Sequence, residues 1–226
     1  MSKTEMHVVA YIDFLGSRKK IMKDDGTYLN QMLSLYENIS KIFAPFIEDI
    51  KLRIFSDNIV FARKITDNEE NRISNLNNMT SIAAAIQFFA ILHSGSLVKG
   101  GITFGEFYAD NLIVWGKGLV EAYELESDKN HVMPTIVLGG EAKVIAENNL
   151  QRLQMVCKET SGDLIIDYMQ FKGVDEIMMN MHRQAINGIA SDIFTSGLQE
   201  GSISDSLMLK LKWLNDYHNQ LSERAI

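Results

Sequence analysis

The chain has 226 residues, of which 46% are hydrophobic and 23% are charged, with a formal net charge of -7 and a single cysteine. This balance is typical of a soluble globular protein of one large domain, and a lone cysteine excludes an internal disulfide framework. The negative charge argues against non-specific nucleic-acid binding, which depends on many Lys and Arg contacts to phosphate, but it allows a small phosphorylated substrate held by metal ions.

The first half of the chain alternates between runs of β-branched residues and runs with helical spacing of apolar residues. Gly16, Ser17 and a basic turn over 18–20 follow the first of these runs. The patterns predict, in chain order, a strand over 6–13, a helix over 28–43, strands over 52–55 and 59–62, a helix over about 73–92 and a strand over 97–104. This order is that of the ferredoxin-like βαββαβ unit, with one antiparallel sheet and both helices on one face.

The second half of the chain adds further strands and helices to this unit. The patterns predict strands over 112–115, 135–138 and 164–168, helices over 118–126, 174–195 and 204–222, and surface loops over 66–72 and 126–131. We therefore expect a single α+β domain over 1–226, with a core over about 6–170 and a helical extension over about 171–226.

Two aspartates lie at the ends of strands that this topology places side by side. Asp13 ends the first strand, and Asp57 lies in Ser56-Asp57-Asn58, the predicted tip of the hairpin. Carboxylates at neighbouring strand ends can hold Mg²⁺, which completes its coordination shell with water and substrate phosphates. Each aspartate alone has an ordinary explanation as a turn residue, but the pair favours a metal site.

The residues after Asp13 predict a phosphate-binding segment. Phe14, Leu15, Gly16 and Ser17 supply backbone N–H groups that can surround a triphosphate. Four basic residues are further candidates for this role, although burial statistics favour a surface charge for each one taken alone: Arg18, Lys19, Lys20 and Lys99.

Several motifs, in this order, resemble those of the class III nucleotide cyclases. Residues 11–16 (Tyr-Ile-Asp-Phe-Leu-Gly) and 54–57 (Ile-Phe-Ser-Asp) resemble the two metal-binding motifs of that family. Residues 99–105 resemble its Arg-x-Gly-Ile-x-x-Gly strand, and 114–126 resemble its Ile-Trp-Gly segment and the following helix. The sequences of these motifs and of residues 212–219 are most similar to those of the short bacterial cyclases of Pycsar antiphage systems, which make cyclic UMP or cyclic CMP.

The resemblance implies a metal-dependent cyclase with two Mg²⁺ or Mn²⁺ ions per site. Asp13, Asp57 and the backbone carbonyl of Phe14 would be the metal ligands, and the two aspartates the catalytic residues. The chain would act on UTP or CTP as a homodimer with shared active sites, releasing 3′,5′-cyclic UMP or CMP and pyrophosphate as an antiphage second messenger. A separate effector protein activated by the cyclic nucleotide would complete the system.

Two positions bear on the choice of base. Arg53 lies where adenylate cyclases carry a base-reading Lys, so the resemblance implies that it binds the substrate, whereas strand alternation explains it equally well as a solvated charge. Lys99 is the other basic residue expected to bind substrate. Ile113 lies where adenylate cyclases carry an Asp that reads adenine, which argues against ATP as the substrate.

The chain departs from the family on the helix after Trp115. Val120 and Glu124 occupy the positions of the Asn and Arg that stabilise the transition state, and neither can stabilise developing negative charge. An alternative is therefore a degenerate cyclase dimer that binds nucleotide without turnover. A palm-type nucleotidyltransferase, whose strand layout is the same, is a third hypothesis, weakened by the absence of an acidic pair at 57–58.

The remaining features predict a cytoplasmic protein that binds neither a membrane nor nucleic acid. Residues 1–5 lack the apolar run of a signal peptide, and no run approaches the roughly 20 apolar residues of a membrane helix. The histidines show no zinc-site spacing, and Cys157 is expected to be a buried strand residue.

Overall fold

The computed structural model describes residues 4–44, 49–170, 176–200 and 203–224. Its strands form a mixed sheet in the order β2-β3-β1-β4-β6-β8-β7, and β5 pairs with β4 off this path. The strands are β1 (Glu5–Phe14), β2 (Ile50–Phe55), β3 (Asn58–Lys64), β4 (Val98–Ala109), β5 (Val114–Trp115), β6 (Ile136–Leu138), β7 (Val156–Lys158) and β8 (Leu164–Ile166). The central strand β1 pairs antiparallel with both β3 and β4, as the βαββαβ order predicts.

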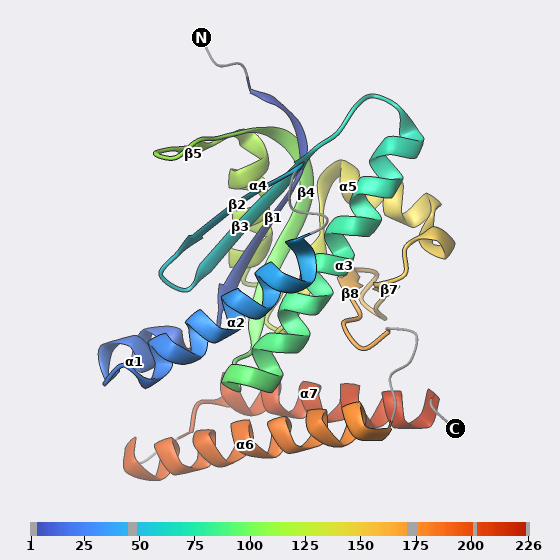
Figure 1. Cartoon of the computed structure of the whole chain (residues 1–226). Helices are drawn as coiled ribbons and strands as arrows, with labels where there is room; N and C mark the ends of the chain where they lie inside the picture. The colour runs from blue at the N-terminus through green and yellow to red at the C-terminus, as the bar shows by residue number, and fades with distance from the viewer. Residues whose placement is uncertain (1–3, 45–48, 171–175, 201–202, 225–226) are drawn as a thin grey trace.

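The helices cover the sheet unequally (Figure 1). They are α1 (Ser17–Met22), α2 (Thr27–Phe43), α3 (Glu69–Ser94), α4 (Lys117–Ser127), α5 (Gly140–Asn148), α6 (Glu176–Glu200) and α7 (Asp205–Arg224), with a 3₁₀ turn at Leu150–Arg152. Helices α2 and α3 lie on one face of the sheet, whereas α4 and the β4–β5 hairpin lie on the other (Figure 1). Helix α3 is buried on most of its surface because α2, α5 and α6 also pack against it.

Alternation along β1 separates two apolar clusters. Val8, Ala10 and Ile12 belong to the large core under α2 and α3, whereas Val9 and Tyr11 belong to a smaller cluster under α4 and the β4–β5 hairpin. Since side chains alternate along a strand, Asp13 faces the same side as Val9 and Tyr11. The side of the sheet that carries Asp13 is therefore the side that α4 covers only in part.

Glycines allow α4 to approach the sheet closely. A Cβ atom on Gly101 would lie 2.4 Å from the backbone oxygen of Ala122 in α4, and one on Gly105 would lie 2.5 Å from the Cα of Gly118. Real Cβ atoms do not approach other atoms so closely, so a larger residue at either position would push the helix away. The glycine-rich motif at 99–105 thus places the C-terminal end of α4 beside the end of β1.

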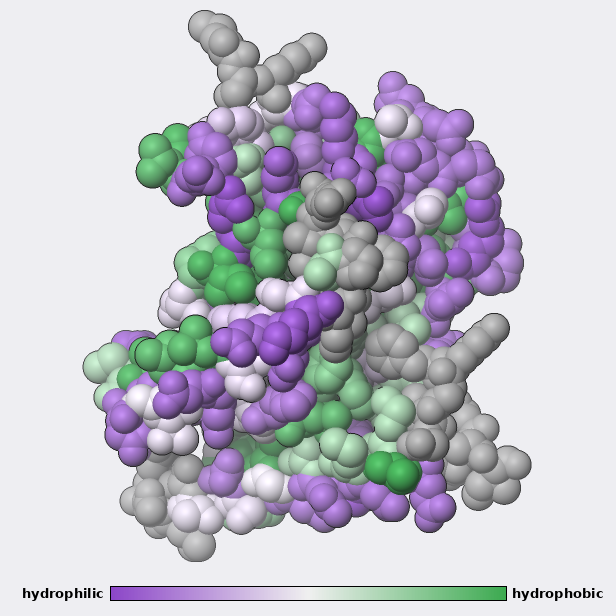
Figure 2. Space-filling model, viewed as in Figure 1, coloured by the Kyte–Doolittle hydropathy of each residue, from purple (hydrophilic) through white to green (hydrophobic). Residues whose placement is uncertain are grey.

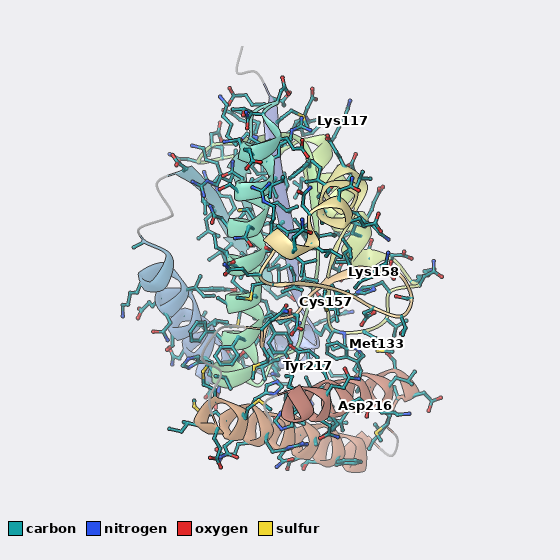
Figure 3. All side chains as sticks on the ribbon, turned by 90° about the vertical axis from the view of Figure 1, so that its right-hand side faces the viewer. Lys117, Met133, Cys157, Lys158, Asp216 and Tyr217 are labelled. Atoms are coloured by element: carbon teal, nitrogen blue, oxygen red, sulfur yellow. The ribbon has the colours of Figure 1, made fainter. Side chains whose placement is uncertain are left out.

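Helices α6 and α7 form a hairpin that packs on the rest of the chain through buried polar groups. His182 of α6 is fully buried and forms hydrogen bonds with the hydroxyl of Tyr168 (2.9 Å) and Nδ1 of His218 (2.9 Å). Tyr217 points from α7 toward the sheet (Figure 3), and its hydroxyl donates to Asp167 at 2.6 Å. The docking of this hairpin therefore depends on a hydrogen-bonded cluster rather than on apolar packing alone.

The predicted elements are largely confirmed, with several corrections. The strand predicted over 112–115 is limited to Val114–Trp115, the strand predicted over 164–168 ends at Ile166, and residues 174–175 of the helix predicted over 174–195 lie outside the described residues. The segment 18–20 is part of helix α1 rather than a turn, and the hairpin tip contains only Ser56 and Asp57, since Asn58 pairs with Phe55. Helix α3 begins at Glu69, inside the predicted loop over 66–72. Cys157 lies in β7 as predicted, but it is half-buried rather than buried.

The early start of α3 has a local cause. The side chain of Asn68 accepts a hydrogen bond from the Asn71 amide at 3.0 Å, which caps the helix. Glu69 and Glu70 then lie in the first turn, where negative charge is favourable. Charged residues that suggested a loop are therefore helix-start residues.

Candidate active site

The structure brings Asp13 and Asp57 together at one end of the sheet. The amide of Phe14, next to Asp13, donates to the backbone carbonyl of Asp57 at 3.1 Å. In the β1–β3 register Asp13 lies directly opposite Asn58, the residue after Asp57. The predicted meeting of the two aspartates is thus explained by strand pairing and by the short hairpin tip.

Hydrogen bonds fix the side chain of Asp57. One carboxylate oxygen accepts the hydroxyl of Ser17, and the other accepts the side-chain amide of Asn58 at 3.2 Å. Asn58 is held in turn, because its side-chain oxygen accepts the hydroxyl of Tyr11. At the tip itself, Ser56 adopts a left-handed conformation with φ of 55°, which turns the chain sharply before Asp57.

Negative charges crowd around Asp13. Burial, together with the nearby carboxylates of Glu126 and Asp57, raises the pKa of Asp13 to about 6, while Lys99 acts in the opposite direction. Burial also raises the pKa of Glu126. A site with three neighbouring carboxylates and one lysine favours an added cation, because the cation offsets their mutual repulsion.

Glu126 and Lys99 complete the charged surroundings of Asp13. Lys99 lies directly opposite Asp13 in the β1–β4 register, is buried, and donates from Nζ to the backbone carbonyl of Asp128 at 3.2 Å. Glu126 lies near the end of α4. We did not predict Glu126 from the sequence, and the only available signal was the glycine pair 100–101, which implies close packing of a helix over that strand.

The residues present fit Mg²⁺ or Mn²⁺. Asp13 and Asp57 supply hard carboxylate oxygens, and Ser17 and Asn58 hold Asp57 in position. Among the residues that the structure describes, no group of three or more His, Cys, Asp or Glu side chains is arranged to hold a metal ion. A site with two carboxylate ligands is suited to an ion whose remaining ligands are water and phosphate oxygens.

The segment predicted to bind phosphate forms the turn between β1 and α1. The amides of Phe14 and Leu15 donate to the carbonyls of Asp57 and Leu97. Gly16 has φ of 76°, a conformation that favours glycine. The predicted contact with a triphosphate would therefore fall mainly on the amides of Gly16 and the following residues.

The basic candidates lie in different surroundings. Lys20 points toward the end of α3, where Nζ donates to the carbonyl of Ser94 and to the hydroxyl of Ser96 at 3.2 Å. Arg18 and Lys19 are exposed on α1. Arg53 donates to the backbone carbonyls of Asp110 and Leu52 rather than pointing freely into solvent.

The positions where the chain departs from the cyclase motifs are exposed. Val120 of α4 is 55% exposed, and Glu124, one turn later, is also exposed. Ile113, in the turn between β4 and β5, is 51% exposed. All three are accessible to a second molecule.

No helix among the described residues is long and apolar enough to cross a membrane.

Solved structures of cyclase domains share this fold at low sequence identity. The adenylyl cyclase CyaB from P. aeruginosa matches with a TM-score of 0.53 and 11% identity, over 73% of this chain and 95% of that one. The monomeric guanylyl cyclase domain of the RhoGC fusion protein from the aquatic fungus Blastocladiella emersonii matches with a TM-score of 0.52 and 12% identity, over 73% and 98% of the two chains. The guanylyl cyclase Cya2 matches with a TM-score of 0.50 and 11% identity, over 78% and 98%.

No protein-family profile and no curated protein sequence matches the chain. The similarity to solved structures identifies the α+β fold of class III cyclase domains and confirms the predicted fold class.

Proposed function

We propose that the chain is a metal-dependent nucleotide cyclase that converts UTP or CTP to 3′,5′-cyclic UMP or CMP and pyrophosphate. The observation that carries this proposal is the meeting of Asp13 and Asp57 at one end of the sheet, on a fold that cyclase domains share. The role in antiphage signalling, the cytoplasmic location and the separate effector rest on the resemblance of the motifs to the Pycsar cyclases.

Asp13 and Asp57 would hold the metal ions, with the carbonyl of Phe14 as a further ligand. When bound, such ions lower the pKa of the ribose 3′-hydroxyl and stabilise the leaving pyrophosphate. Ser17 and Asn58 keep the Asp57 carboxylate oriented toward the site. Lys99, buried beside Asp13, would balance the charge of the carboxylates and would lie near the phosphates.

The choice of a pyrimidine is supported by what the chain lacks in the adenine-reading position. Ile113 cannot form a hydrogen bond with an exocyclic amino group through its side chain. An apolar residue there removes the contact that selects ATP in adenylate cyclases. The similarity of the motif sequences to those of the Pycsar cyclases favours UTP or CTP.

A homodimer is supported by two exposed surfaces that carry large apolar side chains. One surface, on the β4–β5 hairpin and α4, carries exposed apolar residues beside the acidic Glu121 and Glu124: Leu112, Ile113, Trp115, Val120 and Tyr123. The other, on α1 and α2, carries exposed apolar residues beside the basic Arg18 and Lys19: Ile21, Met22, Leu29 and Leu33. Figure 2 shows apolar patches at the β4–β5 hairpin and over α1 and α2. Head-to-tail pairing would bring such surfaces together.

The test is product analysis by mass spectrometry after incubation of the purified chain with each ribonucleoside triphosphate and Mn²⁺. We expect a cyclic monophosphate from UTP or CTP, and a loss of at least about 100-fold in rate for Asp57→Asn, because a neutral amide is a poor metal ligand. Asp67→Asn is the matched control, since the Asp67 side chain is fully exposed in its pair with Arg72. Equal turnover by Asp57→Asn would contradict the proposed site.

A second candidate is a degenerate cyclase dimer that binds nucleotide without turnover. It is favoured by the exposed Val120 and Glu124, which cannot donate hydrogen bonds to a developing negative charge. Nucleotide binding by calorimetry, without product from any of the four triphosphates, would support it. Oligonucleotide products would instead support the palm-type hypothesis.

A further inference from the structure

The guanidinium of Arg53 is bonded to two backbone carbonyl groups. Nε and Nη2 both donate to the carbonyl of Asp110, at 3.0 and 2.5 Å, and Nη1 donates to the carbonyl of Leu52 at 2.6 Å. Each nitrogen of the guanidinium thus has a partner within the chain. Arg53 belongs to β2, at the edge of the sheet, whereas Asp110 follows β4, so these bonds join two distant segments.

Asp110 organises the turn between β4 and β5. Its carboxylate accepts the amides of Leu112 (2.7 Å) and Ile113 (2.8 Å) and the hydroxyl of Tyr108 (2.7 Å). Its own amide donates to the carbonyl of Ile113 at 3.0 Å. The conformation of the whole turn therefore depends on where Asp110 is held.

Besides its direct continuation from β4, the turn contacts the neighbouring strands through two groups of described residues. Ala109 and Val114, which flank it, pack against the apolar cluster that contains Val60 and Ala62 of β3. Arg53 supplies the second contact, and it acts on the backbone at the tip. Apolar packing has no preferred direction, so by itself it allows the hairpin to slide over the sheet. Hydrogen bonds from the planar, charged guanidinium to one carbonyl oxygen hold the hairpin in a single position.

The turn displays large apolar side chains to solvent. Leu112 is 93% exposed, Ile113 is 51% exposed and Trp115, at the end of β5, is 69% exposed. Figure 2 shows this apolar tip projecting at the upper left. Any function of these exposed side chains requires the turn to hold them in a defined place.

We propose that Arg53 is a positioning residue that fixes the β4–β5 turn through the Asp110 carbonyl, and with it Ile113 and Trp115, rather than a residue that reads the base. Only the expected effect on kcat/KM rests on the proposed cyclase activity. The observation that carries the inference is that the guanidinium donates three of its five N–H groups to backbone carbonyls, two of them to that of Asp110, which orients it toward the turn.

The test compares Arg53→Met and Arg53→Lys with the control Lys51→Met, an exposed residue of the same strand. Amide hydrogen exchange and the emission of Trp115, measured in a Trp213→Phe background, report the turn directly. We expect about tenfold faster exchange of the Leu112 and Ile113 amides in Arg53→Met, because the loss of charge-assisted hydrogen bonds loosens the turn. Arg53→Lys should restore this only in part, since an ammonium lacks the planar pair of donors.

Kinetics with each of the four triphosphates and Mn²⁺ separate positioning from reading. We expect Arg53→Met to lower kcat/KM by the same factor for every nucleotide that the wild type uses. A loss confined to one base would overturn the inference, as would unchanged exchange and emission at the turn. If the wild type turns over no nucleotide, the proposed function fails, and exchange and emission alone still decide whether Arg53 holds the turn.

Discussion

Acid should destabilise the chain through the buried histidines beneath the α6–α7 hairpin. His182 is fully buried and forms hydrogen bonds with Tyr168 and His218. Beside it, Tyr217 forms a hydrogen bond with Asp167. Burial, together with the neighbouring His218 and the charge of Arg183, lowers the pKa of His182 from 6.5 to about 3. The folded chain therefore keeps this imidazole neutral at pH values where the unfolded chain protonates it.

The sign and size of the effect follow from proton linkage. Above pH 6.5 neither state binds the proton, so the free energy of unfolding is unaffected. Below it the unfolded state binds the proton more strongly than the folded state, and the free energy of unfolding falls by about 1 kcal/mol at pH 5.5 and about 3 kcal/mol at pH 4.5. The loss ends near pH 3, where the folded state also binds the proton. Burial lowers the pKa of His218 as well, which adds to the loss in the same direction.

Urea denaturation followed by circular dichroism at several pH values between 7.5 and 4.5 measures this loss. His182→Gln keeps a polar group beside Tyr168 but cannot titrate. Below pH 6 we therefore expect the free energy of unfolding to fall less steeply for His182→Gln than for the wild type, with a difference in slope of about 1 kcal/mol per pH unit. His93→Gln, at an exposed position, is the matched control and should follow the wild type. Parallel pH profiles for His182→Gln and the wild type would refute the reasoning.

Three other predictions concern the site and the packing around it. Asp13 has a pKa of about 6 and must be ionised to bind metal, so the apparent affinity for Mn²⁺ should fall about tenfold per pH unit below 6. Calorimetry measures this affinity, and a constant value from pH 7 to 5 would exclude Asp13 as a ligand. Gly101→Ala should lower the free energy of unfolding by about 1–3 kcal/mol, since its Cβ would lie 2.4 Å from the oxygen of Ala122. Gly188→Ala, in helix α6 with no atom within 4 Å of the added Cβ, should raise it by about 0.5–1 kcal/mol.

Strand periodicity and hairpin chemistry explain why the centre of the fold was predictable. The strand pattern in 6–13 and the short connection between β2 and β3 are local features. The βαββαβ order of the elements then predicted that the first strand pairs with both the hairpin and the fourth strand, which places Asp13 and Asp57 near each other. Each of these inferences depends on residues close together in the sequence or on a topology with few alternatives.

The remaining parts of the site depend on long-range placement, which local patterns do not specify. Lys99 lies opposite Asp13 only in the observed β1–β4 register, and Glu126 reaches the site only because glycines let α4 pack closely. The bonds of Arg53 require the β4–β5 hairpin to fold back over the sheet. The shared face of Asp13 and Tyr11, in contrast, follows from the sequence alone, since residues two apart on a strand point to the same side of the sheet.

The position of the two aspartates has a consequence for how the chain folds. Asp13 and Asp57 meet only after β1 has paired with the β2–β3 hairpin, across the whole of α2 in the sequence. Closing that long loop is slow compared with forming a helix, so a partly folded chain would lack a complete ion site. Divalent ions would then bind the native state alone and stabilise it by mass action, by about 2.7 kcal/mol at a free concentration 100 times the dissociation constant.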